Sequence, residues 1–232
     1  MNLIDILAKL KGLGTAKAIE GMARFGITPD RTFGVSMPNL RKIGKEIGVD
    51  HDLARQLWEA GYRETRILAS IIDDPLLVTE GQADAWIKDF DYWEICDQCC
   101  MNLFWRLPFA DKKAIEWSKR ENEFEKRAGF ALMACFGWKD KTADNERFKK
   151  FYPAMIRESN DERTLVKKAI SWALRNIGKK NPELNREAIE IGEEVQKLDS
   201  SAAKWIASDV LRELTSEKIQ ERLKKSYRRR YN

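Results

Sequence analysis

The chain has 232 residues, 43% of them hydrophobic, which is enough apolar material for a folded core and excludes an intrinsically disordered protein. Its 42 basic and 37 acidic residues leave a net charge of +5, which does not by itself identify a polyanionic partner. No run of about 18 apolar residues occurs, so no membrane-spanning helix is expected.

The first segment, "MNLIDILAKLKGLG" (residues 1–14), is expected to be an ordinary helix. Asp5 interrupts its apolar stretch and no small-residue cleavage site follows, so it does not resemble a signal peptide. Four cysteines are too few for a disulfide scaffold in a chain of this length. We therefore expect a cytoplasmic protein.

Helices are predicted for almost the whole chain, because apolar residues recur at three- and four-residue spacing. The clearest segments are 82–106, 111–119, 123–137, 146–158, 161–180, 183–197 and 201–214. The six prolines stand mostly between these segments or in their first turns, and no alternating strand pattern or hairpin signal is present. The sequence therefore predicts an all-α fold.

Several of these helices share one design, in which a basic residue precedes a small or aliphatic run that stays apolar for two turns. If "WEICDQCCMNLFW", with an acid in place of the basic residue, joins them, the equivalent positions recur at intervals of 31, 30, 41 and 36 residues; they are Arg66, Asp97, Arg127, Lys168 and Lys204. Such intervals fit stacked helix pairs of the HEAT type, in which the second helix of each pair lines a concave surface. We expect one HEAT-like helical-repeat domain over residues 1–232, a solenoid with a basic concave face. An irregular bundle with chance similarity is the alternative.

The stretch "DYWEICDQCC" (residues 91–100) combines aromatic, acidic and thiol side chains. Trp93 and Asp97 are four residues apart and share one helix face, whereas Cys96, Cys99 and Leu103 share an apolar face. Zinc would need more ligands than these thiols supply, but the chain has a single histidine, His51, and an isolated Cys135. We expect the cysteines to be core residues and no metal to be bound.

A second stripe runs along the predicted helix 161–180. Lys168, Trp172, Arg175 and Lys179 fall at positions i, i+4, i+7 and i+11 of one face. A solvated charged face with a half-covered ring is one explanation of this stripe. Trp93 and Asp97 on one repeat and Arg127 on another favour the alternative, a binding surface.

The available chemistry is limited. No Ser or Cys nucleophile stands beside a histidine, and neither a Walker-type glycine loop nor an HExxH motif occurs. A lone carboxylate among aromatic and cationic side chains suits a polyanionic substrate whose reaction develops positive charge. Cleavage of a glycosidic bond does so through an oxocarbenium-like transition state, which a preorganised carboxylate can stabilise.

Four motifs resemble those of the AlkD-type DNA alkylation repair glycosylases, which are HEAT-like repeat proteins. They are "FGVSMPNLRKIGKEI", "YWEICD", "EKRAGFAL" and "KKAISWALRNIGKKNPE", in the family's order and spacing, and the resemblance covers about residues 20–210. It implies an enzyme that excises positively charged N3- or N7-alkylated purines from duplex DNA as a monomer, without a cofactor and without inserting the base into a pocket.

The resemblance also implies residue roles. Asp97 matches the catalytic aspartate, Trp93 and Trp172 match the two active-site tryptophans, and Arg127 matches an arginine that contacts DNA at the lesion. We expect Lys168, Arg175 and Lys179 to bind DNA phosphates with Arg127. The family's Trp-Trp-Asp run is replaced by Tyr92-Trp93-Glu94, which alters the flanks and keeps Trp93 and Asp97.

Two other functions remain compatible with these residues. A non-catalytic binder of damaged or branched DNA would use the same surface without turnover. A protein-interaction scaffold is a common use of HEAT repeats, but it would favour an acidic or apolar stripe in place of Lys168–Lys179. The basic C-terminal tail, about residues 216–232, fits either a solvated tail or an anchor on nucleic acid.

Overall fold

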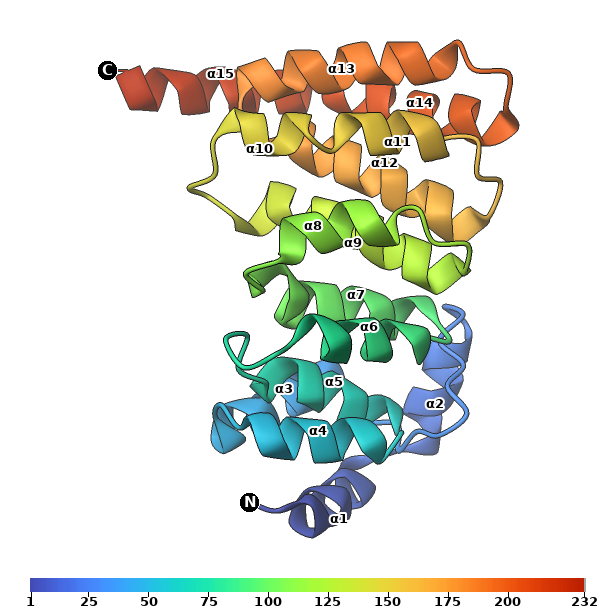
Figure 1. Cartoon of the computed structure of the whole chain (residues 1–232), viewed down its shortest axis with the longest axis vertical. Helices are drawn as coiled ribbons and strands as arrows, with labels where there is room; N and C mark the ends of the chain where they lie inside the picture. The colour runs from blue at the N-terminus through green and yellow to red at the C-terminus, as the bar shows by residue number, and fades with distance from the viewer. Residues whose placement is uncertain (232) are drawn as a thin grey trace. The chain divides into compact units, whose positions relative to one another are not determined.

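The computed structural model describes the backbone of residues 1–231 and the side chains of residues 1–225. Within that part the chain is helical and contains no β-strand, which confirms the predicted all-α class (Figure 1). It divides into two compact units, Met1–Ala110 and Asp111–Asn232, here called the N-terminal unit and the C-terminal unit. The expectation of one domain over residues 1–232 stays a prediction.

The N-terminal unit begins with three helices that precede the paired repeats and ends with a short 3₁₀ turn. Its elements are α1 (Leu3–Leu13), α2 (Ala16–Ala23), α3 (Met37–Ile47), α4 (His51–Glu59), α5 (Arg63–Ile72), α6 (Glu80–Lys88), α7 (Trp93–Asn102) and η1 (Phe104–Arg106). Helix α5 packs against α3, α4 and α7, so it forms the centre of this unit.

The C-terminal unit begins with α8, whose first residue, Ala110, lies at the boundary between the two units. Its elements are α8 (Ala110–Trp117), α9 (Glu123–Lys139), α10 (Asn145–Lys149), α11 (Tyr152–Glu158), α12 (Thr164–Gly178), α13 (Pro182–Gln196), α14 (Ser201–Leu214) and α15 (Glu217–Tyr231). Helix α12 packs against α9 on one side and against α14 on the other. Most of the predicted tail of residues 216–232 forms α15, and the side chains of residues 226–232 lie outside the described part.

The second helices of successive pairs are neighbours within each unit, as the repeat pattern predicted. Helix α5 lies beside α7, and α9, α12 and α14 follow one another (Figure 1). Side-chain caps define many of the helix starts: the side chains of Asn2, Asp50, Thr79, Asn181 and Ser200 each accept a hydrogen bond from a first-turn amide.

Two predicted helices are interrupted. The continuous helix expected over 82–106 is wrong, because α6 ends at Lys88, Asp89 accepts a hydrogen bond from the Trp58 indole at 2.8 Å, and Tyr92 has extended backbone. The helix expected over 146–158 is divided into α10 and α11, because Pro153 has no amide hydrogen with which to continue the first helix.

The four cysteines are free thiols and are fully buried: Cys96, Cys99, Cys100 and Cys135. The interpretation of these residues as core is therefore confirmed. No group of three or more potential metal ligands gathers within the described residues. Among the described helices, none has both the length and the hydrophobicity needed to cross a bilayer.

A buried ion network joins α5 to α7 in the N-terminal unit. The Arg63 guanidinium donates two hydrogen bonds of 2.7 Å to the Glu94 carboxylate, and further ones to Glu64 at 3.1 Å and to the Val35 carbonyl at 2.9 Å. Arg63 is 3% exposed and Glu94 is 6% exposed. Burial alone would lower the pKa of Arg63, but the hydrogen bonds and charge of Glu94 raise it, so the guanidinium stays charged.

Glu64 extends this network to the loop before α3. Its carboxylate accepts hydrogen bonds of 3.0 Å from the backbone amides of Phe33, Gly34 and Val35, and one of 2.9 Å from the Thr32 hydroxyl. Three consecutive amides point at one carboxylate because Gly34 has a φ of +77°, a conformation that side-chain-bearing residues rarely adopt. The "FGVS" motif is thus a binding loop for a carboxylate of this same chain.

Glu94→Gln should lower the free energy of unfolding by about 3 kcal/mol, because it removes the carboxylate that accepts two hydrogen bonds from the buried Arg63 and leaves Glu64 as its only ionic partner in the network. Urea unfolding followed by circular dichroism measures this. The paired change Arg63→Met with Glu94→Leu should recover part of the loss, since both of these groups become apolar while Glu64 keeps its hydrogen bonds to three backbone amides and the Thr32 hydroxyl. A Glu94→Gln effect as small as that of Lys9→Gln, which breaks the exposed Lys9–Glu46 pair, would show that the network contributes little.

Gly129, in the "EKRAGFAL" motif, lies where α9 approaches the end of α8. A Cβ atom at this position would stand 2.5 Å from the Ser118 amide nitrogen and 2.8 Å from the Ala114 carbonyl oxygen. Neither backbone atom can move without shifting α8. Glycine is therefore required at this position by the distance between two helix backbones.

Gly129→Ala should destabilise the protein by about 2 kcal/mol through overpacking. Gly21→Ala is the matched control, since a Cβ there meets nothing within 4 Å and alanine favours a helix by roughly 0.5–1 kcal/mol. Thermal unfolding of the two variants should therefore shift in opposite directions. A stabilising Gly129→Ala would contradict the close packing of α8 and α9.

Candidate functional site

Trp93 and Asp97 occupy the first two turns of α7, as the sequence predicted. Trp93 is the first residue of the helix, and its indole N–H donates a 2.9 Å hydrogen bond to the carbonyl of Phe25 in the turn after α2. Asp97 follows one turn later and is 7% exposed. The two residues therefore belong to a short, well-fixed stretch of helix in the N-terminal unit.

The residues around them explain why this stretch is fixed. Glu94 is paired with Arg63, and Tyr92, the residue before the helix, is buried. Cys96 and Cys99 are fully buried, as predicted for the apolar face. With its other faces tied to the core, α7 holds Trp93 and Asp97 at a constant position relative to α5.

Arg127 lies on α9 in the C-terminal unit and is 6% exposed. Its guanidinium donates a 2.6 Å hydrogen bond to the carbonyl of Leu165, in the first turn of α12. Part of this side chain therefore ties α9 to α12. Its expected contact with DNA stays a prediction.

The predicted stripe on α12 is present, and an acidic partner accompanies it. Lys168 is exposed and Trp172 is half-buried. Arg175 forms an ion pair with Glu213, and the Lys179 ammonium donates a 2.7 Å hydrogen bond to the same carboxylate. Two of the three cations of the stripe are therefore paired with α14.

A second carboxylate of α14 completes this cluster. Asp209 lies 3.2 Å from the Arg175 guanidinium and accepts a 2.6 Å hydrogen bond from Ser171. Sequence reasoning missed both acids, although Asp209 and Glu213 are four residues apart in "SAAKWIASDVLREL" and share one face of the next repeat. Arg175 and Lys179, one repeat earlier, are also four residues apart. This matching spacing of two acids and two bases on successive repeats could have predicted the ion pairs from the sequence.

The electrostatics of the cluster favour the paired state. Burial would raise the pKa of Glu213, but hydrogen bonds from Lys179 and Arg175 and their positive charges lower it below its ordinary value. Glu213 is therefore ionised at neutral pH. A phosphate that approached Arg175 or Lys179 would have to compete with it.

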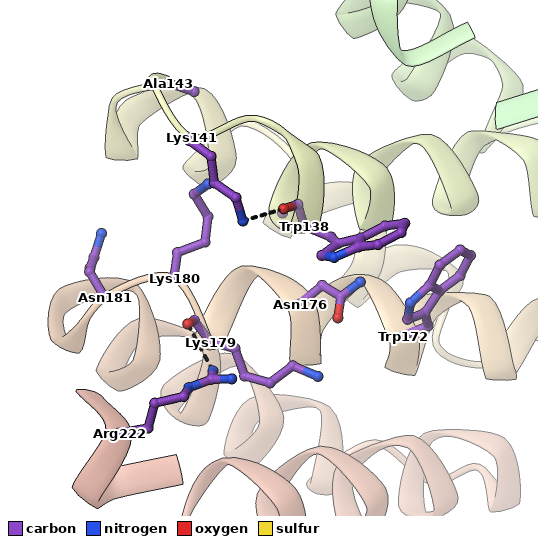
Figure 2. Close-up of a pocket in the computed structure, with 10 residues that line it drawn as sticks. Trp138, Lys141, Ala143, Trp172, Asn176, Lys179, Lys180, Asn181 and Arg222 are labelled. Carbon is purple, nitrogen blue, oxygen red and sulfur yellow. Dashed lines mark hydrogen bonds between the residues drawn. The ribbon is translucent and has the colours of Figure 1, made fainter. Parts of the chain in front are cut away.

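Trp172 and Lys179 also line a pocket of about 680 Å³ in the C-terminal unit. Trp138 from the end of α9 forms part of the same lining, together with Asn176, Lys141 and Arg222. Figure 2 shows the indoles of Trp138, from α9, and Trp172, from α12, next to each other, with the Asn176 side chain drawn beside them. Of these residues, only Trp172 and Lys179 were predicted.

Comparison with solved structures identifies the fold as a HEAT-like helical repeat. One match is a protein from a family related to the HEAT-like repeat DNA glycosylases, with affinity for branched DNA structures; it is 20% identical, covers 91% of this chain and 95% of its own, and has a TM-score of 0.74. A designed armadillo repeat protein is 15% identical and covers 76% of this chain and 92% of its own, with a TM-score of 0.35. No curated protein matches the sequence.

The family follows from the sequence match. The model of the DNA alkylation repair enzyme family matches residues 6–213, which is most of the chain. The chain belongs to this family.

Glu213→Gln should strengthen binding to plain duplex DNA, because it releases Arg175 and Lys179 from a competing carboxylate. The slope of log affinity against log salt should also steepen by about 0.9 for each additional phosphate that the protein binds. Fluorescence anisotropy over a series of salt concentrations measures both quantities. Glu190→Gln, which alters an exposed acid on α13, serves as the control. Unchanged affinity and slope would show that neither cation reaches a phosphate.

Proposed function

We propose that the protein is a DNA glycosylase that removes positively charged N3- or N7-alkylated purines from duplex DNA. The observation that supports this most directly is Asp97, a largely buried carboxylate one turn after Trp93, in a chain of the DNA alkylation repair enzyme family. The enzyme acts on DNA in the cytoplasm, associated with the nucleoid while bound, as a monomer and without a metal or other cofactor.

The chemistry is hydrolysis of the N-glycosidic bond. The bond between C1′ and the base nitrogen breaks with its electron pair going to the base, which neutralises the positive charge of the alkylated ring. The sugar passes through an oxocarbenium-like state that the Asp97 carboxylate stabilises, and water then adds to C1′ and loses a proton. A cationic purine is a good leaving group, so no pocket is needed to activate it.

The other residues bind and position the DNA in this proposal. Trp93 and Trp172 pack on the sugar–phosphate backbone of the lesion nucleotide, and Arg127 contacts the backbone near the lesion. Lys168, Arg175 and Lys179 bind phosphates, with Lys168 the most readily available because no salt bridge involves it within the described residues. Arg175 and Lys179 bind after exchanging Glu213 for phosphate.

A non-catalytic DNA binder is the second candidate. It is favoured by the solved protein with affinity for branched DNA, whose fold covers 91% of this chain. The binder would use the same surface and differ from the enzyme in turnover alone. An assay of base release therefore separates the two.

Asp97→Asn should reduce excision by roughly 10²-fold or more, since it removes the negative charge that stabilises the oxocarbenium. Affinity for duplex DNA should stay equal or rise slightly, because a carboxylate near phosphates has been removed. Release of free 7-methylguanine from methylated duplex under single-turnover conditions measures the first quantity, and anisotropy measures the second. Trp172→Ala should instead lose both rate and affinity, because its role is positioning.

The control is Asp52→Asn, at an exposed acid on α4, which should leave both measurements unchanged. Wild-type excision by Asp97→Asn would exclude Asp97 as the catalytic residue. Absence of base release by the unmodified protein, together with tight DNA binding, would favour the non-catalytic binder.

A further inference from the structure

We infer that the pocket between Trp138 and Trp172 binds one unpaired nucleotide of DNA, with its base against Trp138 and its phosphates on Lys141 and Arg222. This rests on the proposed function only in requiring that the protein bind DNA. The nucleotide is not the base being excised. It is an unpaired nucleotide next to duplex, as at a flap, an overhang or a branch point.

The Trp138 side chain is largely open to solvent. It is 52% exposed near the end of α9, whereas Trp58 and Trp86 are each 5% exposed and Trp117 is fully buried. Indoles contribute most to stability when buried, so one held half in solvent beside a cavity is available for a ligand. The Lys139 ammonium lies 4.8 Å from the centroid of the Trp138 ring, so the opposite face of the indole is the one open to a ligand.

The geometry of the two indoles supports this. Trp58 and Trp86 stack on each other with ring centroids 4.0 Å apart and thereby cover their own faces. Trp138 and Trp172 form no such stack in the described part of the chain, although both line one pocket (Figure 2). A flat ring can therefore lie against the face of Trp138 that Lys139 leaves open, and stacking of a base on an aromatic side chain is worth ~1–3 kcal/mol.

Lys141 and Arg222 place positive charge at the pocket. The Lys141 ammonium donates a 2.6 Å hydrogen bond to the carbonyl of Trp138, and the Arg222 guanidinium donates one of 3.1 Å to the carbonyl of Lys179. Both partners are neutral carbonyls at the ends of α9 and α12. No carboxylate pairs with either cation among the described residues, in contrast to Lys179 and Arg175, which share Glu213.

These positions hold two full positive charges in place beside the exposed indole. The helix ends favour the cations because their carbonyls carry partial negative charge. Arg222 uses one of its five N–H donors in the contact with Lys179, so the others can bind phosphate oxygens. A phosphate here would displace no acid.

The size of the pocket and the polar group of Asn176 in its lining also suit a single nucleotide. A volume of about 680 Å³ lies within the range of ordinary small-ligand sites and is too small for a duplex segment. Asn176 lines the pocket and uses its amide group in a 3.2 Å bond to the Ala134 carbonyl, leaving its carbonyl oxygen able to accept from a base edge. A base pair inside a duplex cannot stack on an indole, because neighbouring base pairs cover both of its faces, and a terminal base pair brings the rest of its duplex with it. The occupant is therefore an unpaired nucleotide.

The test compares two DNAs that share one duplex sequence, one blunt and one carrying a short single-stranded flap. The unmodified protein should bind the flap DNA more tightly. Trp138→Ala should lose roughly tenfold on the flap DNA, equal to about 1.4 kcal/mol, and change little on the blunt duplex. Trp138→Phe should retain part of the preference, because a smaller ring still stacks.

Trp205→Ala is the matched control, since Trp205 is another exposed indole of the C-terminal unit at 38% exposure and does not line the pocket. It should leave the preference for flap DNA unchanged. Arg222→Gln should weaken binding of flap DNA and reduce its salt dependence by about 0.9 in log–log slope, the value for one phosphate contact. Arg186→Gln, at an exposed arginine on α13, should not.

Equal losses on both DNAs, or no loss, for Trp138→Ala would overturn the assignment of this pocket while leaving the proposed glycosylase intact. Failure of the unmodified protein to bind either DNA would overturn both proposals. Flap preference that depends on Trp138, combined with no base release, would support the pocket and contradict the proposed excision.

Discussion

The buried pairing of Arg63 with Glu94 and Glu64 is the interaction on which the N-terminal unit depends. It joins three segments, because Arg63 begins α5, Glu94 lies in the first turn of α7, and Glu64 binds the amides of the loop before α3. Moving charged groups out of water costs several kcal/mol for each ion unless hydrogen bonds compensate. Each of these groups has such bonds, so the arrangement has one low-energy geometry, and Trp93 and Asp97 take their positions on α7 from it.

The cations of the chain differ by partner more than by residue type. Arg63 is buried and structural, Arg175 and Lys179 share the Glu213 carboxylate, and Lys141 and Arg222 are held by neutral backbone carbonyls. An arginine that already pairs with a carboxylate gains little electrostatic free energy by binding a phosphate, since one anion replaces another. A cation that is hydrogen-bonded only to a neutral carbonyl loses no ion pair when it binds a phosphate. The strongest phosphate sites therefore need not be the cations that a helical stripe brings to notice.

Much of the fold followed from periodicity, and the failures have local causes. The helix expected over 201–214 was found as α14 (Ser201–Leu214), because its apolar spacing and its Ser200 cap agree. The helix predicted over 82–106 is interrupted at Tyr92, which has extended backbone, and the helix predicted over 146–158 is interrupted before Pro153, which lacks an amide hydrogen. The spacing of apolar residues contains no information on either feature. For the candidate site, periodicity placed Trp93 and Asp97 on one helix, but Glu213 and Trp138 come from other helices. Their effects depend on packing between repeats that a single-helix pattern does not contain.

The same reasoning divides the family motifs into structural and chemical positions. Gly34 and Gly129 are required by backbone conformation and by close helix packing, and position 94 needs a carboxylate that reaches Arg63. Glutamate satisfies position 94 with two hydrogen bonds of 2.7 Å, so the change from the Trp-Trp-Asp run to Tyr92-Trp93-Glu94 keeps the role of that position. Agreement at such positions reports the fold, because a non-catalytic relative needs them equally. Evidence for excision must therefore come from Asp97, whose charge the proposed reaction uses directly.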